Sequence, residues 1–187
     1  MRDVIEIETP RLKLRNLRMS DAQRVAQFCG DADVARMILR APVPYLSVAA
    51  EGWIMTLNAR KPLGHDFVFA AELEGEGLIG VIGAHRLGDE AYEVGYWYGR
   101  PYWGHGLATE ALNAFVAEAK TLGALQAGHF ADNPASGRVL QKAGFAYTGE
   151  VAKLYSLGRG ESAPVKRMRY APSIERGFGP REAMLVH

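Results

Sequence analysis

Cysteine is almost missing from this sequence, which has Cys29 and no other among its 187 residues. A single thiol excludes an internal disulfide and any metal site built from several cysteines, and it fits a reducing compartment. Cys29 lies at helical intervals from Ala22, Val25 and Ala26, which favours a buried side chain over a catalytic one. The five histidines include no pair at ligand spacing with a nearby acid, so we expect no metal site.

Long apolar runs are also missing. No segment approaches the roughly 18 consecutive apolar residues of a membrane span. The first residues, Met1 to Glu6, carry acids where a signal peptide needs an apolar run. We therefore expect a cytoplasmic protein that has no membrane partner.

Neither sign of charge is in excess. Lysine and arginine total 22 against 21 aspartates and glutamates, the formal net charge is +1, and the basic residues are scattered. A near-neutral chain offers no long-range field to nucleic acid, so we expect no such partner. Any anion site must be local.

The composition is that of an ordinary globular protein, with 48% hydrophobic and 23% charged residues. The length predicts a single domain, which we place over residues 1–170. The apolar pattern fades after Tyr170, and residues 171–187 are interpreted as a C-terminal tail. A monomer and a homodimer both remain open.

The hydrophobic period changes several times along the chain. It predicts a strand at 11–15, helices up to about residue 60, and three meandering strands between 67 and 98. A helix from about 108 to 122, a strand at 126–130, a helix at 134–143 and strands at 145–148 and 164–170 follow. This order indicates a mixed α/β sheet, in which the helix after the fourth strand makes a parallel crossover to the fifth.

Two glycines, Gly104 and Gly106, lie in the turn between the fourth strand and the next helix. Unpaired N–H groups and the helix dipole make such a turn suited to phosphates. A P-loop is excluded because no lysine follows Gly106. A dinucleotide fingerprint is excluded because Thr109 replaces its third glycine and no acid follows at the required distance. A pyrophosphate cradle of successive backbone amides remains, alongside a turn that serves tight packing only.

A second cluster runs from Asn133 to Phe145, directly after the fifth strand. Asn133 precedes a helix that begins with proline, where an N-cap is its ordinary role. Ser136 lies in the first turn, where its ordinary role is a local hydrogen bond to the backbone.

Together the two clusters resemble the GNAT superfamily of acyl-CoA-dependent N-acetyltransferases, and within it the RimJ/RimL-like branch that acetylates ribosomal-protein N-termini. The resemblance runs to about Tyr170 and rests on Thr9–Leu12, Glu93–Trp97, Tyr102–Ala111 and Asn133–Phe145. It implies an α/β fold with a mixed, mostly antiparallel central sheet of six to seven strands flanked by helices, in which the fourth and fifth strands splay apart.

The resemblance also implies an activity. Acetyl-CoA would be the cofactor, and its acetyl group would move to a primary amine by direct attack in a ternary complex. The amine would be a protein N-terminal α-amine or that of a small molecule. Two alternatives stay open: a non-catalytic acyl-CoA-binding regulatory module, and a transferase that uses a longer acyl-CoA.

The family pattern assigns catalytic roles to three residues of this chain. Glu93 would accept the amine proton, directly or through water, and Ser136 would assist the leaving thiolate. Asn133 would orient the cofactor arm or a water molecule. A backbone N–H near Trp97 would stabilise the oxyanion.

The resemblance likewise implies the cofactor contacts. The pantetheine arm would pair with backbone groups of the fourth strand like an added strand, and the pyrophosphate would lie on the amides of the turn. The residues expected to hold the cofactor are Trp97, Tyr98, Gly99, Trp103, Gly104, His105, Gly106, Leu107, Ala108, Thr109, Asn133 and Ser136.

The acceptor region is less defined by motifs. We expect it to be shaped by residues 31–60 and by a loop at 153–162. Four arginines there or nearby, Arg36, Arg40, Arg60 and Arg159, would favour acidic or phosphorylated acceptors, although the ordinary role of exposed arginines is solvation.

Overall fold

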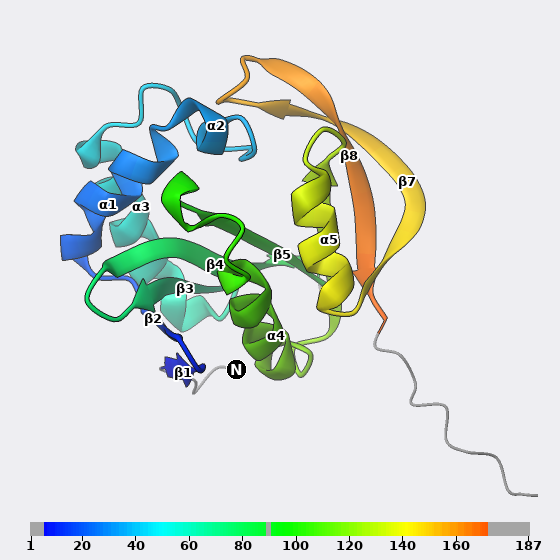
Figure 1. Ribbon diagram of the computed structural model, residues 1–187, viewed down its shortest axis with the longest axis horizontal. Coiled ribbons are helices and arrows are strands. Elements are labelled where there is room, and N and C mark those ends of the chain that lie inside the picture. Colours follow the sequence, from blue (N-terminus) through cyan, green and yellow to red (C-terminus); the bar gives the residue numbers. More distant parts are fainter. Residues whose placement is uncertain (1–5, 89–90, 172–187) are drawn as a thin grey trace, which may run out of the picture.

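The computed structural model describes residues 6–88 and 91–171 and shows one sheet with helices on both faces (Figure 1). In these residues the sheet has eight strands in the order β1-β2-β3-β4-β5-β6-β8-β7. The strands are β1 Glu6–Glu8, β2 Leu12–Asn16, β3 Asp66–Leu73, β4 Gly77–Leu87, β5 Ala91–Tyr98, β6 Ala124–Phe130, β7 Phe145–Ser156 and β8 Glu161–Tyr170.

The pairing is antiparallel everywhere except between β5 and β6, which run parallel. The mixed, mostly antiparallel sheet and its parallel crossover are thus confirmed. The predicted strand count of six to seven is wrong by one short strand, β1. Its three residues, two of them glutamates, are too few and too polar to show a strand pattern, and they form a strand because they pair with β2.

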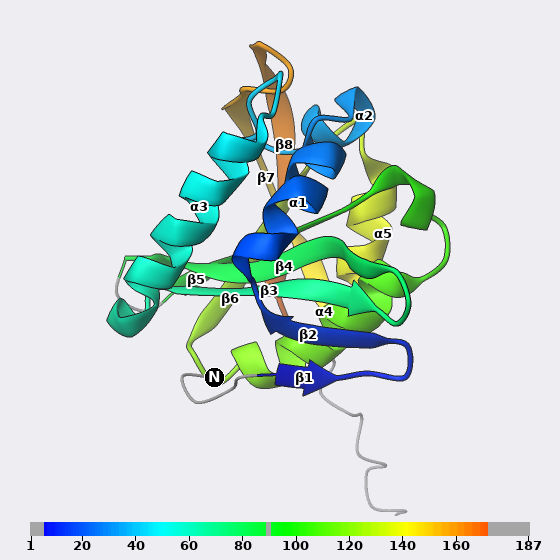
Figure 2. The same cartoon turned by 90° about the vertical axis from the view of Figure 1, so that its left-hand side faces the viewer.

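Five α-helices cover the sheet in the described part of the chain. They are α1 Ala22–Cys29, α2 Ala32–Ala35, α3 Ser47–Arg60, α4 Leu107–Ala119 and α5 Pro134–Lys142, with single 3-10 turns at Met19–Asp21, Lys61–Leu63 and Arg100–Tyr102. Figure 2 shows α1 and α3 on one face of the sheet and α4 on the other. None of the helices described is long and apolar enough to cross a membrane.

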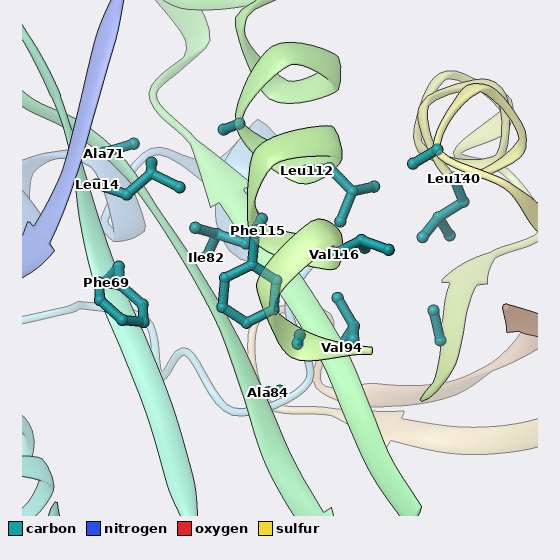
Figure 3. Packing of buried hydrophobic residues seen from close by; sticks show 14 of the residues in the cluster. Leu14, Phe69, Ala71, Ile82, Ala84, Val94, Leu112, Phe115, Val116 and Leu140 are labelled. Atoms are coloured by element: carbon teal, nitrogen blue, oxygen red, sulfur yellow. The ribbon is translucent and has the colours of Figure 1, made fainter. Parts of the chain in front are cut away.

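The larger core lies between the sheet and α4. Leu112, Phe115 and Val116 of α4 are buried against apolar side chains of β2 to β5 (Figure 3). The rings of Phe115 and Phe69 meet edge to face at 6.1 Å. On the opposite face, α1 and α3 bury a second cluster that includes Ile54. Because α4 is held firmly on β5, the turn that joins them has a fixed start and a fixed end.

The last two strands form a hairpin longer than predicted. The expected strands at 145–148 and 164–170 extend to β7 and β8, and most of the expected loop at 153–162 is strand. A register shift between Tyr147 and Val151, with Gly149 at φ +86°, breaks the alternation on which the prediction relied. The hairpin tip reaches the segment after α2 (Figure 1), where Leu157 N–H donates to the Leu39 carbonyl at 3.0 Å. The expected tail lies outside the described residues except for Ala171.

Candidate active site

The strands β5 and β6 separate in the middle of the sheet. They pair from Ala91 with Ala124 to Val94 with Ala127, and no further. Beyond that point β5 stays paired with β4 up to Tyr98, while β6 stays paired with β8 up to Phe130. We call the space between residues 95–98 and 128–130 the gap. It is the predicted splay.

The backbone groups of β5 alternate between β4 and the gap. Gly99 N–H donates to the Ile79 carbonyl at 2.9 Å, and the Trp97 carbonyl lies 2.5 Å from where a Cβ on Gly80 would stand. Trp97 and Gly99 therefore direct backbone groups toward β4. The period of two turns the groups of Tyr96 and Tyr98 toward the gap. Of the three residues expected to pair with a pantetheine arm, Tyr98 is the one at the open edge.

One group on this edge is already engaged. The Trp103 indole N–H donates to the Tyr98 carbonyl at 2.7 Å, and the Trp103 side chain is 43% exposed. The indole therefore lies beside the gap. The N–H of Tyr98 and both backbone groups of Tyr96 remain on the open edge.

The glycine loop, residues 99–106, joins β5 to α4. Gly104 and Gly106 have φ of +80° and +76°, which side chains with a Cβ rarely adopt. A Cβ on Gly104 would meet nothing within 4 Å, so conformation and not crowding requires the glycine. The first helical bond runs from Glu110 N–H to the Gly106 carbonyl at 3.0 Å, which leaves the amides of Leu107, Ala108 and Thr109 ahead of it. His105 is exposed between the glycines, and these amides lie where the cradle was predicted.

A carboxylate on α4 joins this loop to the segment between β1 and β2. Glu110 accepts hydrogen bonds from the Thr9 hydroxyl at 2.7 Å, from Arg11 N–H at 2.8 Å and from Arg11 Nε at 2.7 Å. Arg11 also donates to the His105 carbonyl at 3.0 Å. Burial alone would raise the pKa of Glu110, but the bonds from Thr9 and Arg11 outweigh it and lower that pKa. We call these three residues the loop clamp. The sequence motifs contained all three, but nothing in their spacing indicated the contact.

Asn133 and Ser136 lie where α5 begins, across the gap from β5. Asn133 is the N-cap, and its side-chain oxygen accepts from Ser136 N–H at 3.1 Å. The Ser136 hydroxyl lies 3.0 Å from the Tyr96 hydroxyl of β5. The structure therefore brings Ser136 to the edge of the gap, and it adds Tyr96, which sequence reasoning did not single out.

Glu93 lies on the opposite face of β5 from Tyr96. Its two carboxylate oxygens accept from Arg167 of β8 at 2.8 and 2.6 Å, and this hydrogen bond raises the pKa of Arg167. Arg167 crosses β6 at Gly128, where a Cβ would come within 3.0 Å of the guanidinium and 2.8 Å of Val165. The side chains of Glu93 and Arg167 are 28% and 17% exposed, respectively. Glu93 and Ser136 thus approach the gap from opposite faces of the sheet.

Tyr147, a second hydroxyl near α5, is engaged elsewhere. It lies 2.9 Å from His129 Nε2, while His129 Nδ1 lies 2.8 Å from the Phe130 carbonyl. Because a carbonyl only accepts, Nδ1 carries a hydrogen, and in the neutral imidazole the Tyr147 hydroxyl therefore donates to Nε2. This contact packs β6 and β7 against Gly137 of α5. No group of three or more histidine, cysteine or acidic side chains that could hold a metal occurs within residues 6–88 and 91–171.

Most arginines near the expected acceptor region are paired. Asp132 accepts from Arg36 at 2.8 Å and from both Nη atoms of Arg159 at 2.9 and 2.8 Å. The Arg159 hydrogen bond is the main reason that the pKa of Asp132 is lowered. We call Arg36, Asp132 and Arg159 the hairpin lock, because they join the segment after α2, the end of β6 and the tip of the β7–β8 hairpin. Arg60 is paired with Asp66 at 3.2 Å.

Comparison with known proteins identifies the family and the fold of this chain. The sequence matches the family model described as an acetyltransferase (GNAT) domain over residues 11–146. A relative from Bacillus licheniformis, described as the uncharacterized N-acetyltransferase p20, is 30% identical over 111 residues, or 58% of this chain. The match spans 62% of that relative, which is less than two thirds of its length.

Solved structures share the fold across most of the chain. RimL, a ribosomal L7/L12 α-N-protein acetyltransferase solved with coenzyme A, has a TM-score of 0.77 at 16% identity, with 89% of this chain and 98% of that chain covered. Mycobacterium smegmatis RimJ, solved with a CoA disulfide, has a TM-score of 0.74 at 22% identity, with 88% and 84% covered. Since the family model covers more than half of the sequence, this chain belongs to the GNAT acetyltransferase family.

Proposed function

We propose that this chain is an acetyl-CoA-dependent N-acetyltransferase that moves an acetyl group to a primary amine, with a peptide α-amine as the preferred acceptor. One observation carries the proposal. The open edge of β5 leads directly into a row of unpaired amides at the start of α4. An extended arm that ends in a diphosphate has the shape and the charge for these two neighbouring features.

The residues present fit coenzyme A. The amides from Gly104 to Thr109 precede the first hydrogen bond of α4, in a loop whose glycines have room beside them, and the dipole of α4 adds to their attraction for a diphosphate. The arm would use the groups that Tyr96 and Tyr98 leave on the open edge, with Trp103 beside them. The loop clamp holds the amides in place before binding, so that little ordering is needed.

Bound acetyl-CoA would supply a thioester next to Ser136. The amine nitrogen would form a bond to the acetyl carbon, and the carbon–sulfur bond would break with its electron pair on sulfur. The proton that nitrogen loses would go to Glu93 or to water, and the leaving thiolate would take a proton from water. The backbone N–H of Tyr96 or Tyr98 at the gap would donate to the carbonyl oxygen as it gains charge. Ser136 would donate a hydrogen bond to the sulfur, and Asn133 keeps the first turn of α5 in position for it.

Glu93 would accept the amine proton, directly or through a water molecule. Arg167 fixes the orientation of its carboxylate and occupies one side of each oxygen. An α-amine, with a pKa of about 7.7–8.0, needs less from such a base than a lysine, with a pKa of about 10.4. The paired state of Arg36, Arg60 and Arg159 does not support a preference for acidic acceptors.

The test is release of free coenzyme A from acetyl-CoA. The panel contains peptides with a free α-amine and blocked lysines, including N-terminal peptides of ribosomal proteins. It also contains the same peptides with a blocked α-amine and free lysines, and small amines. We expect release with free α-amines first, and acetylation at the N-terminus by mass spectrometry.

The alternatives give different results in the same assay. A non-catalytic binding module would bind coenzyme A in calorimetry and release no thiol with any acceptor. A transferase for longer acyl groups would release thiol faster from succinyl-CoA than from acetyl-CoA. If the folded protein did not bind millimolar coenzyme A or acetyl-CoA at all, the proposal would be wrong.

A further inference from the structure

A pair of hydroxyl groups bridges the gap. Tyr96 lies on β5 two residues beyond the last pair with β6, and its hydroxyl reaches the first turn of α5. There it contacts Ser136 twice, at 3.0 Å from the side-chain oxygen and 3.1 Å from the backbone carbonyl. The ring is packed against the core under α4. The serine that the proposed reaction needs is therefore held by a residue of β5, on the opposite side of the gap.

The hydrogens of this pair have two arrangements. The Ser136 carbonyl can only accept, so in the first arrangement it receives the single Tyr96 hydrogen, and Ser136 donates to the Tyr96 oxygen. In the second, Tyr96 donates to the Ser136 side-chain oxygen, and the Ser136 hydrogen is free for another acceptor. Rotation of two hydroxyl hydrogens converts one into the other, with no movement of heavier atoms.

Burial supports this reading of the pair. It raises the pKa of Tyr96 to about 12, although the hydrogen bond with Ser136 opposes the change. The Tyr96 hydroxyl therefore keeps its hydrogen throughout the neutral range and is always able to donate it. Tyr92 provides a contrast, because it is buried on the same face of β5 and its hydroxyl has no hydrogen bond within the part of the chain that the structure describes.

We propose that Tyr96 is a positioning residue. It donates its own hydrogen to the Ser136 side-chain oxygen, so that the Ser136 hydroxyl is directed toward the sulfur of the thioester and can donate to it. This inference rests on the proposed function. No bond to Tyr96 or Ser136 forms or breaks, since the pair supplies hydrogen bonds while charge grows on the sulfur. Tyr96 thereby couples the wall of β5 to the start of α5.

A double-mutant cycle tests the coupling. We expect Tyr96→Phe to lower kcat about tenfold at saturating acetyl-CoA, the effect of one well-placed hydrogen bond, while the KM of the amine changes less than about twofold. Ser136→Ala should lower kcat about 100-fold. Tyr96→Phe added to Ser136→Ala should cost less than a further twofold, because the group on which Tyr96 acts is gone.

Tyr92→Phe is the matched control. It removes a hydroxyl from the same face of the same strand and should leave kcat unchanged. Calorimetry of coenzyme A binding and thermal melting separate positioning from packing. A packing role of Tyr96 would weaken binding or lower Tm, and it would cost the same factor with and without Ser136. Equal losses in both backgrounds, or no loss in Tyr96→Phe, would overturn the inference.

A measurement that needs no catalytic turnover tests the role of Tyr96 separately from the proposed function. If the wild type releases no thiol with any acceptor, the proposed function fails, and amide NMR decides the rest. Addition of coenzyme A should shift the Ser136 amide signal in the wild type and in Tyr92→Phe, and shift it less in Tyr96→Phe. An identical shift in all three proteins would overturn the role of Tyr96.

Discussion

The two sides of the gap are built in different ways. The proposed cofactor side consists of main-chain amides between Gly104 and Thr109, adjacent in sequence and shaped by two glycines with positive φ. The proposed acceptor side consists of charged side chains that meet from distant parts of the chain. Arg36 and Asp132 are 96 positions apart, and Glu93 and Arg167 are 74 apart. A site made of main chain leaves a local sequence pattern, whereas a site made of ion pairs leaves none.

The difference also concerns tolerance to change. Amides are supplied by every residue except proline, so the cofactor side depends on conformation more than on side-chain identity. On the acceptor side, the loss of one partner leaves a charge without compensation. Substitutions on the cofactor side should therefore affect coenzyme A binding, and those on the acceptor side should affect the amine.

The largest effect is expected from the acceptor side. Glu93→Gln removes the proposed base and should lower the rate at pH 7 about 100-fold, with little change in coenzyme A affinity. The deficit should shrink toward pH 9, because the α-amine then loses its proton without help. Rates measured across this pH range check it, and Glu150→Gln, which removes another carboxylate near Arg167, is the control. A deficit independent of pH would show that Glu93 is not the base.

The next effect tests the cofactor side. Gly106→Ala places a side chain at φ +76°, which costs about 1–2 kcal/mol, so the exposed loop should relax and coenzyme A should bind about tenfold more weakly. Calorimetry measures the affinity. Gly75→Ala is matched, because Gly75 has the same φ of +76° and free space in the turn between β3 and β4. It should lose stability without losing affinity, and equal affinity losses would contradict a specific role of the loop.

A smaller effect is expected at the hairpin lock. The Arg159 side chain is 8% exposed, bonded to Asp132 and stacked at 4.2 Å on Phe130. Arg159→Met should loosen the hairpin tip and raise the KM of the amine up to about fivefold, with coenzyme A affinity unchanged. Hydrogen exchange at residues 153–162 should increase as well. Arg40→Met serves as the control, because no partner of Arg40 lies in the part of the chain described. A change confined to coenzyme A affinity would reverse the assignment of the two sides.

The smallest effect is visible only in acid. The pKa of Glu110 is lowered in the folded state, so its contribution to stability is complete above its ordinary value of 4.5 and is lost as the pH falls through the lowered value. Melting temperatures between pH 7 and pH 3 should therefore fall less steeply in Glu110→Gln, which starts from a lower Tm at pH 7. Parallel curves would show that the loop clamp does not contribute to the acid response.

Sequence reasoning located the glycine loop because its two glycines are close neighbours in the sequence, and the resemblance to the family supplied the splay. It missed β1, whose three residues form a strand only by pairing with β2. It placed a loop where the β7–β8 hairpin continues, since Gly149 and the register shift conceal the strand period. Tyr96 and Arg167 escaped notice because their roles come from contacts with α5 and β5 that only the closed sheet creates.

The ion pair between Glu93 and Arg167 depends on the absence of a side chain at Gly128. The guanidinium of Arg167 passes over this residue, and a methyl group there would press on both Arg167 and Val165. One nucleotide exchange in a glycine codon yields alanine, so a single mutational event could detach Glu93 from its cation while the main-chain amides of the cofactor side stayed as they are. Relatives of this protein could diverge in the amines they accept along that route without losing their common acyl donor.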